Sequence, residues 1–319
     1  MSRAVVLLFF SSLFYCSFLE GKPIVFEPFM GGKLSTKRFS PKYSPERYME
    51  EGKQFLAKGQ YHKALTCFLI IINHFPGHEL LPESTLLAGK CHLKRDQFDL
   101  ANKLLSKYLT LPEASYSQEL FEMKLQIAAN FALGKRKHLF SLEGFPKLEN
   151  ADQDAFDIYN EVLSAHPFEN LGAVALYYKG ELHRVRKEFD EALKVFQKLT
   201  KQFSSHELSI KAYVAISEIY VIKSLPEPHN TTYLTLSKAN LDKFLKKHPN
   251  HPAIKVLNEN IRKIEECHAK GLYSTGKFYE KKKKPSAAKI YYQTAVSLYP
   301  NTSWVSKCDS RIARLSRKA

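Results

Sequence analysis

The stretch that decides the fold is "EGKQFLAKGQYHKALTCFLIIINHFP", residues 51–76. Its apolar residues follow a helical period on either side of a short Lys-Gly-Gln turn, which predicts two amphipathic helices folded back on each other. Within it Gly52, Ala64, Phe68 and Pro76 are separated by 12, 4 and 8 positions. A spacing of this kind, if it recurs along the chain, is typical of stacked helical hairpins.

The spacing does recur. From Gly276 the same steps reach Ala288, Tyr292 and Pro300. Further copies, each lacking some of the marked positions, include Gly89 with Ala101, Ala155 with Tyr159, Gly180 with Ala192, and Ala239 with Pro249. Five or six related units therefore occupy about residues 44–300. The pattern of small, small, aromatic and proline positions resembles the tetratricopeptide repeat and predicts an all-α superhelix, an α-solenoid of helical hairpins.

Each marked position has a physical reason to be there. Two antiparallel helices approach closely where small side chains face each other, so we expect Gly52 to face Ala64 and Gly276 to face Ala288. Aromatic residues such as Phe68 fill the space within and between hairpins, because one hairpin cannot bury its apolar stripe alone. These residues are predicted to pack, and function is expected from the faces that remain exposed.

Composition limits the partners. The 319-residue chain has a formal net charge of +16, which favours an anionic partner such as nucleic acid, an anionic lipid surface or a carboxylate-bearing peptide. The lysine run at 281–284 is interpreted as a solvated turn, with contact to anionic membrane headgroups as the alternative. A nucleic-acid site is disfavoured, because no aromatic stacking residues are interleaved with the run. No phosphate loop, nucleophile turn or metal-ligand spacing is present, so we expect a protein that is not an enzyme and uses no cofactor or metal.

The N-terminus predicts export. Residues 4–19, "AVVLLFFSSLFYCSFL", are too short for a good membrane span and suit a secretory leader, so residues 1–21 are interpreted as a signal peptide. Cys16 is a candidate lipidation site: Leu13 fits a lipoprotein processing signal, whereas Tyr15 does not. Lipidation of Cys16, ordinary cleavage before residue 22 and an uncleaved anchor all stay open.

The remaining chain divides into regions by the repeat. We expect an extended linker at 22–43, N-terminal units at 44–133, an insertion loop at 134–152, middle units at 153–250, and a C-terminal unit with a capping helix at 251–319. A second insertion is predicted at 223–235 and a long helix at about 252–283. The four cysteines in the repeats are interpreted either as small buried residues or as two local disulfides, Cys67–Cys91 and Cys267–Cys308.

Three segments together resemble a more specific family. They are "YMEEGKQFLAKGQYHKALTCFLIIINHFP" at 48–76, "KANLDKFLKKHPNHP" at 238–252 and "GKFYEKKKKPSAAKIYYQTAVSLYPNT" at 276–302. With the leader, they resemble the BamD family, the tetratricopeptide lipoproteins of the bacterial outer-membrane protein assembly complex. The resemblance implies a scaffold on the periplasmic face of the outer membrane that binds unfolded outer-membrane proteins and a BamA-type barrel. A soluble secreted adaptor or chaperone of the cell envelope is the alternative.

The partner-binding groove is expected on the first helix of each hairpin, on the side turned away from the packing glycines. By equivalent spacing it comprises Met49, Lys53, Leu56, Leu86, Lys90, Leu93, Tyr177, Arg184, Tyr273 and Lys277. A groove that mixes apolar side chains with Lys53 and Lys90 suits an extended segment with alternating apolar residues and a terminal carboxylate.

Overall fold

The computed structural model describes residues 25–26, 34–35, 41–112, 114 and 117–317. The predicted signal peptide with Cys16 lies outside these residues, as does most of the predicted linker. Within the linker, β1 (Val25–Phe26) pairs antiparallel with β2 (Leu34–Ser35).

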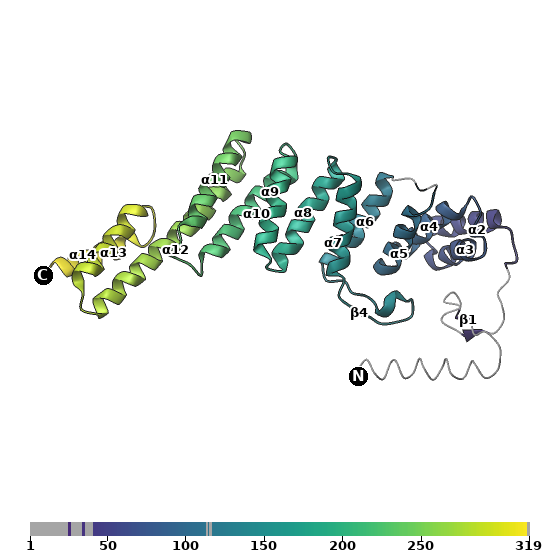
Figure 1. Ribbon diagram of the computed structural model, residues 1–319, viewed down its shortest axis with the longest axis horizontal. Coiled ribbons are helices and arrows are strands. Elements are labelled where there is room, and N and C mark those ends of the chain that lie inside the picture. The colour runs from purple at the N-terminus through teal and green to yellow at the C-terminus, as the bar shows by residue number, and fades with distance from the viewer. Residues whose placement is uncertain (1–24, 27–33, 36–40, 113, 115–116, 318–319) are drawn as a thin grey trace. The chain divides into compact units, whose positions relative to one another are not determined.

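The rest of the described chain is almost entirely helical (Figure 1). Successive helices pack as six hairpins: α2 (Pro45–Ala57) with α3 (Tyr61–His74), α4 (Leu81–Lys94) with α5 (Phe98–Leu109), α6 (Gln118–Ala132) with α7 (Asp152–Ala165), α8 (Asn170–Val185) with α9 (Phe189–Gln202), α10 (Glu207–Ser224) with α11 (Thr232–Lys247), and α12 (Ala253–Lys281) with α13 (Pro285–Leu298). A last helix, α14 (Val305–Ser316), packs on α13. The all-α tetratricopeptide-repeat solenoid predicted from the spacing is confirmed.

The contacts divide the chain into two units, one ending at Ala165 and the other beginning at His166. In the first unit α3 packs on α4, and α5 packs on α6. In the second unit α9 packs on α10, and both α10 and α11 pack on the long helix α12. Each hairpin thus buries its apolar stripe against the next one in its unit, as a solenoid requires.

The glycines of the repeat make room for a ring or a branched side chain. A Cβ on Gly52 would lie 2.6 Å from the ring of Phe68, and one on Gly276 would lie 2.5 Å from the ring of Tyr292. The expectation that these glycines face Ala64 and Ala288 stays a prediction, but the nearest atoms belong to the large side chain four residues further on, which covers the glycine. The packing role itself is confirmed, since Ala64, Phe68, Ala288 and Tyr292 are fully buried.

A buried lysine joins three helices of the first unit. The Nζ of Lys124, on α6, lies 2.6 Å from Glu161 Oε2 on α7 and donates to Ser106 Oγ and Asn102 Oδ1 on α5. Its side chain is 0% exposed, so these contacts compensate for the loss of water around the charge. Burial lowers the pKa of Lys124, and the hydrogen bond to Glu161 opposes that shift.

The insertion at 134–152 is folded. It contains β3 (Lys137–His138), the 3₁₀ turn η2 (Leu139–Ser141) and β4 (Lys147–Glu149), with the two strands paired antiparallel. Its anchor is a buried contact with the start of α5, where His138 Nδ1 lies 2.8 Å from Asp99 Oδ1 and the His138 backbone N–H donates to Asp99 Oδ2. Lys147 Nζ also donates to the carbonyl oxygen of Asp96, 2.6 Å away. The hairpin is therefore held against the α4–α5 turn.

The four cysteines of the repeats are free thiols. The Cys67–Cys91 and Cys267–Cys308 disulfides are thus not formed, and the alternative of small buried residues describes Cys67, Cys91 and Cys308. Among the described helices, none combines the length and the apolar character needed to cross a membrane.

Candidate functional site

A hollow of about 480 Å³ opens on the first-helix side of the second unit. We call it the α8–α10 hollow. Side chains from α8, from α10 and from the segment that begins α12 line it: Tyr177, Glu181, Arg184, Glu207, Ile210, Lys211, Val214, Ala215, Glu218, His251 and Ala253. It therefore brings together two predicted groove residues of α8, Tyr177 and Arg184, with residues of α10 and the start of α12 that lie at least 23 positions away in the sequence.

The floor of the α8–α10 hollow is apolar because it is the exposed edge of the core. Ile210 and Val214, one turn apart on α10, pack against the buried cluster of Tyr213, Phe244 and Leu257. On α8 the ring of Tyr177 packs against Phe196, with ring centroids 6.0 Å apart. The floor can therefore accept an apolar side chain of a partner without rearranging the core.

Charged side chains form the rim, and most are already paired. Arg184 Nη2 donates to Glu181 Oε2 over 2.6 Å, and Arg184 Nη1 lies 3.7 Å from Glu218 Oε2, so this guanidinium bridges α8 and α10. Lys211 lies 3.3 Å from Glu207. Burial raises the pKa of the Tyr177 hydroxyl, which therefore remains a neutral hydrogen-bonding group. The rim offers polar groups to a partner's backbone without presenting an uncompensated charge.

The first unit has a hollow of similar volume, about 490 Å³, beside α2. Met49 and Lys53 line it, together with Glu46, Glu50, Gln54 and Leu80. Lys53 Nζ lies 2.6 Å from Glu83 Oε1. A carboxylate entering this hollow would have to replace that glutamate.

The second predicted groove lysine is paired in the same way. Lys90 Nζ, on α4, lies 2.8 Å from Glu119 Oε1 on α6. Together with the Arg184–Glu218 contact, these pairs repeat one arrangement, in which a cation on one first helix meets a glutamate on the next. Lys53 and Lys90 thus connect neighbouring hairpins. The sequence pattern predicts that they are free to bind a partner's carboxylate, and it does not predict these ion pairs.

The other predicted residues have varied positions. Leu56 and Leu86 are half-buried, while Leu93 is only 5% exposed and has little surface left for a partner. Tyr273 packs its ring against Tyr292 and Trp304, with centroids 5.5 and 5.1 Å apart, so it belongs to the core of the last hairpin. Lys277 is exposed on α12.

Sequence reasoning missed the contribution of α10, namely Ile210, Lys211, Val214 and Glu218. A signal for it exists: Ala239 marks a second helix of a hairpin, so a first helix must precede it. The distance from Ala192 to Ala239 is 47 residues instead of 37, because the insertion lengthens the connection and moves α10 out of the expected register.

Comparison with known families agrees with this geometry. Residues 174–206 and 271–302 match the tetratricopeptide repeat family. These segments overlap the hairpins α8–α9 and α12–α13, and the match indicates no catalytic family. No curated protein matches the chain by sequence. Among the described residues, no group of three or more His, Cys, Asp and Glu side chains is placed to hold a metal ion.

Several solved structures are similar to the chain at low identity and low TM-score. One is a tetratricopeptide repeat protein from Parabacteroides merdae, with 14% identity, a TM-score of 0.38, and coverage of 85% of this chain and 98% of that one. Another is the TPR2AB domain of yeast Sti1 in complex with pHSP90, with 12% identity, a TM-score of 0.30, and coverage of 85% and 98%. A third is the human IFIT1 dimer with PPP-AAAA, with 17% identity, a TM-score of 0.28, and coverage of 86% of this chain and 64% of that one.

Proposed function

We propose that this tetratricopeptide-repeat protein is a non-enzymatic scaffold that holds extended segments of partner proteins in the α8–α10 hollow. The observation that carries the proposal is the arrangement of Tyr177, Ile210 and Val214, which form an apolar floor inside a rim of paired charges. An extended segment presents side chains alternately to two sides, so one apolar residue can enter the floor while the backbone on either side meets the polar rim. Solenoids of this kind use their long first-helix faces as binding surfaces.

The partners we propose are those of the outer-membrane protein assembly complex. The resemblance of residues 48–76, 238–252 and 276–302 to the BamD family supports this choice, as does the similarity of residues 1–21 to a secretory leader. On this proposal the protein works at the periplasmic face of the bacterial outer membrane. It binds segments of unfolded outer-membrane proteins and contacts a BamA-type barrel.

Site-specific photocrosslinking tests the proposed binding face. A photoreactive amino acid is placed at Val214, in the floor of the α8–α10 hollow, and in a matched variant at Lys198, which is exposed on α9. In cells that synthesise outer-membrane proteins, we expect crosslinks to unfolded barrel precursors from position 214 and not from position 198. Equal yields from the two positions, or products without barrel precursors, would reject the proposal.

The proposed location depends on the leader. If Cys16 carries a lipid, the wild-type protein is recovered with outer membranes and the Cys16→Ala variant moves to the soluble periplasmic fraction. Recovery of both proteins in the soluble fraction, with no barrel partner, would instead identify a soluble adaptor of the cell envelope.

A further inference from the structure

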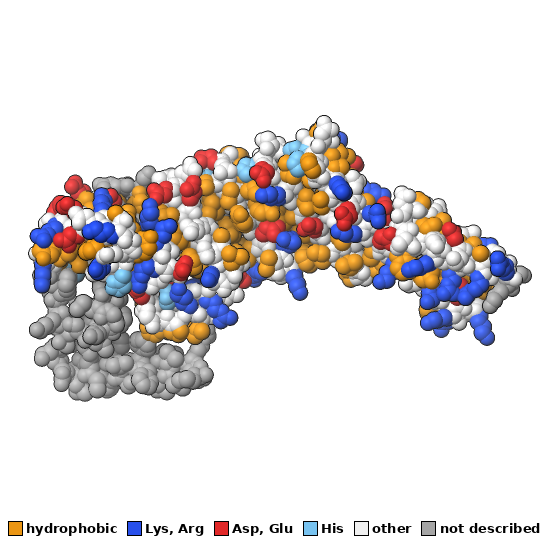
Figure 2. All heavy atoms as spheres, turned by 180° about the vertical axis from the view of Figure 1, so that it is seen from behind, with side chains coloured by type: hydrophobic (Ala, Val, Ile, Leu, Met, Phe, Trp, Pro, Cys, Tyr) orange, Lys and Arg blue, Asp and Glu red, His pale blue; other side chains and the backbone are white. Residues whose placement is uncertain are grey.

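The last part of the second unit is strongly basic. Between residues 253 and 317 the sequence has fourteen lysines and arginines and five aspartates and glutamates, a net charge of +9 out of +16 for the whole chain. Figure 2 shows Lys and Arg side chains gathered over α13 and α14. Such a positive field attracts anionic partners in general. A hollow with a defined shape in the same region would select among them.

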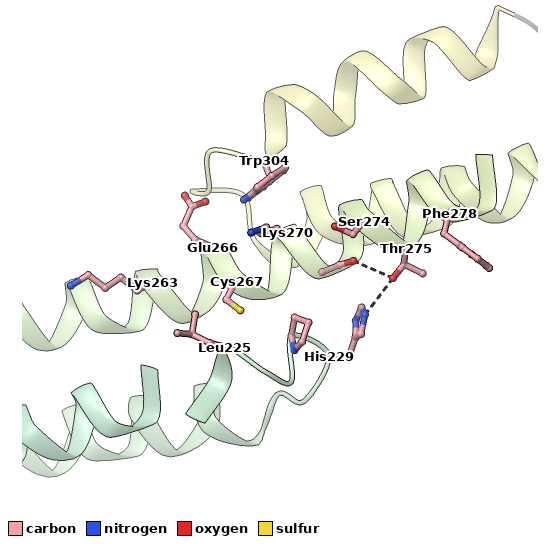
Figure 3. Close-up of a pocket in the computed structure, with 12 residues that line it drawn as sticks. Leu225, His229, Lys263, Glu266, Cys267, Lys270, Ser274, Thr275, Phe278 and Trp304 are labelled. Carbon is pink, nitrogen blue, oxygen red and sulfur yellow. Dashed lines mark hydrogen bonds between the residues drawn. The ribbon is translucent and has the colours of Figure 1, made fainter. Parts of the chain in front are cut away.

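A hollow of about 610 Å³ lies in this region, and we call it the α12 cradle. Its floor is the middle of α12, including Cys267, Lys270 and Ser274 (Figure 3). One wall is the α10–α11 connection with Leu225 and His229, and the opposite wall is the turn that carries Trp304 (Figure 3). None of its lining residues belongs to the α8–α10 hollow.

Specific contacts hold both walls. A Cβ on Gly271 would lie 2.8 Å from Pro228, so the connection rests directly on α12, and a hydrogen bond of 3.3 Å joins His229 to Thr275. On the other side Glu266 accepts hydrogen bonds from the backbone N–H and the hydroxyl of Ser303, at 2.7 and 2.8 Å. The predicted insertion at 223–235 thus forms one wall of the cradle. The carboxylate of Glu266 binds Ser303 in the other wall.

The charge available inside the cradle is positive. Lys263 and Lys270 are two turns apart on α12 and line the cradle, and Lys277 follows at the same interval. Lys270 and Lys277 are exposed and form no ion pair within the described part of the chain, whereas Lys263 lies 3.4 Å from Glu259. A partner carboxylate can therefore pair with Lys270 without displacing an existing partner.

Apolar surface lies beside these lysines. Leu225 is 61% exposed and Phe278 is 53% exposed, although both line the cradle. Trp304 is unsuited to stack a nucleic-acid base, because its ring packs against Tyr273 and the Lys307 ammonium lies 4.1 Å from its centroid. Exposed aliphatic and aromatic surface next to the unpaired Lys270 fits a peptide with both apolar and acidic side chains.

We propose that the α12 cradle binds an extended acidic segment of a partner protein, whose carboxylates pair with Lys263 and Lys270 and whose apolar residues cover Leu225 and Phe278. The distance along α12 from Lys263 to Phe278 is roughly 22 Å, which matches about seven residues of extended chain. This site differs from the α8–α10 hollow in position and in charge, so the protein binds two kinds of segment.

Fluorescence anisotropy with defined peptides tests the proposal. The probe is a labelled seven-residue peptide of alternating glutamate and leucine, and its control has glutamine in place of glutamate. We expect the glutamate peptide to bind, and Lys270→Glu to weaken its binding at least about tenfold, because a like charge replaces an ion pair. The matched control is Lys243→Glu, which makes the same charge change at an exposed site on α11 and should alter the affinity less than about twofold.

A second readout locates the bound peptide. Cys267 lies on the cradle floor, so bound glutamate peptide should slow its alkylation by iodoacetamide in the full-length protein, measured by mass spectrometry. The proposal is overturned if the peptide does not bind, if Lys270→Glu and Lys243→Glu have equal effects, or if Cys267 is not protected. It is also overturned if oligouridylate or vesicles of anionic lipid bind through Lys270 while the peptide does not.

The two proposals can fail separately. Val214→Glu changes the α8–α10 hollow and should leave binding of the glutamate peptide unchanged. Loss of that binding in Val214→Glu would contradict an independent site in the cradle.

Discussion

Gly180 and Phe196 are in direct contact across the α8–α9 hairpin: a Cβ on Gly180 would lie 2.5 Å from the Phe196 ring. Residues 16 positions apart make the same contact at Gly52 and Phe68, Gly89 and Leu105, and Gly276 and Tyr292. One contact is therefore repeated along the chain. In each copy the glycine on the first helix leaves space that a large side chain from the second helix fills.

This contact predicts that Gly180→Ala destabilises the protein. Alanine normally stabilises a helix interior relative to glycine by about 0.5–1 kcal/mol. Here the methyl group would overlap the fully buried Phe196 ring, and overpacking of this kind costs about 1–3 kcal/mol, so we expect a net loss in the free energy of unfolding. Urea denaturation measures it.

Two variants control for this effect. Gly77→Ala adds a methyl group where no atom lies within 4 Å and should change stability little. Phe196→Leu combined with Gly180→Ala should cost less than the sum of the two single changes, because the smaller side chain leaves room for the methyl group. Additive costs would show that the contact does not set the helix separation.

The buried Lys124–Glu161 pair predicts an asymmetry between its two members. Lys124 is 0% exposed at its side chain and Glu161 is 35% exposed, so Glu161→Ala leaves an enclosed charge while Lys124→Met leaves a carboxylate that water can reach. We expect Glu161→Ala to cost about 3 kcal/mol and Lys124→Met to be near neutral. Chemical denaturation of both variants at neutral pH tests the order, and a larger loss in Lys124→Met would contradict it.

The same pair predicts a pH dependence. Because burial lowers the pKa of Lys124 in the folded protein, the unfolded chain binds more protons between that pKa and the usual value of 10.5. The free energy of unfolding therefore rises with pH between the lowered pKa of Lys124 and 10.5. The rise should be largest in Glu161→Ala, because the hydrogen bond that opposes the lowering of the Lys124 pKa is then absent. The comparison is the free energy of unfolding of Glu161→Ala between pH 7 and pH 10, with Lys124→Met as the variant that lacks the titration.

The His138–Asp99 contact predicts that the β3–β4 hairpin can be released without unfolding the repeats. Asp99→Ala leaves the buried backbone N–H and ring of His138 without their acceptor, which costs about 1–3 kcal/mol. Hydrogen exchange should accelerate across residues 136–149 and stay unchanged in α2 and α3. Asp157→Ala, at an exposed site on α7, is the control, and equal protection of the hairpin in both variants would contradict the anchor.

The free thiols predict a graded reactivity. Burial raises the pKa of Cys91 to about 12 and that of Cys308 to about 11, and Cys67 is also buried. Because the thiolate is the reactive form, iodoacetamide at pH 8 should modify Cys267 in the folded protein and the other three only after unfolding. Fast modification of Cys91 in the native protein would show that the α4 packing is open.

The fold could be predicted because each marked position of the repeat acts within one hairpin. The spacing of Gly276, Ala288 and Tyr292 places two helices side by side without knowledge of the rest of the chain. The spacing alone did not identify the Tyr292 ring, rather than Ala288, as the nearest neighbour of Gly276, because that depends on how far the ring extends across the hairpin.

Less of the proposed binding face could be predicted from the sequence. Tyr177 and Arg184 were predicted for it by helical position, and both line the α8–α10 hollow, whose binding role is still a proposal. The glutamates opposite Lys53 and Lys90 come from the following hairpins, and the period alone does not fix their position. The insertion at 134–152 was expected as a loop because its anchor, Asp99, lies in a different hairpin.

The most direct test of the account is the affinity of the α8–α10 hollow for an extended client segment. A labelled C-terminal peptide of an outer-membrane barrel protein is titrated with the wild type, with Val214→Glu in the floor and with Lys198→Glu on α9, after thermal melting has shown that all three are folded. We expect Val214→Glu to weaken binding at least about tenfold, equivalent to 1.4 kcal/mol, and Lys198→Glu to stay close to the wild type. Equal affinity of the three proteins, or no binding by the wild type, would contradict it.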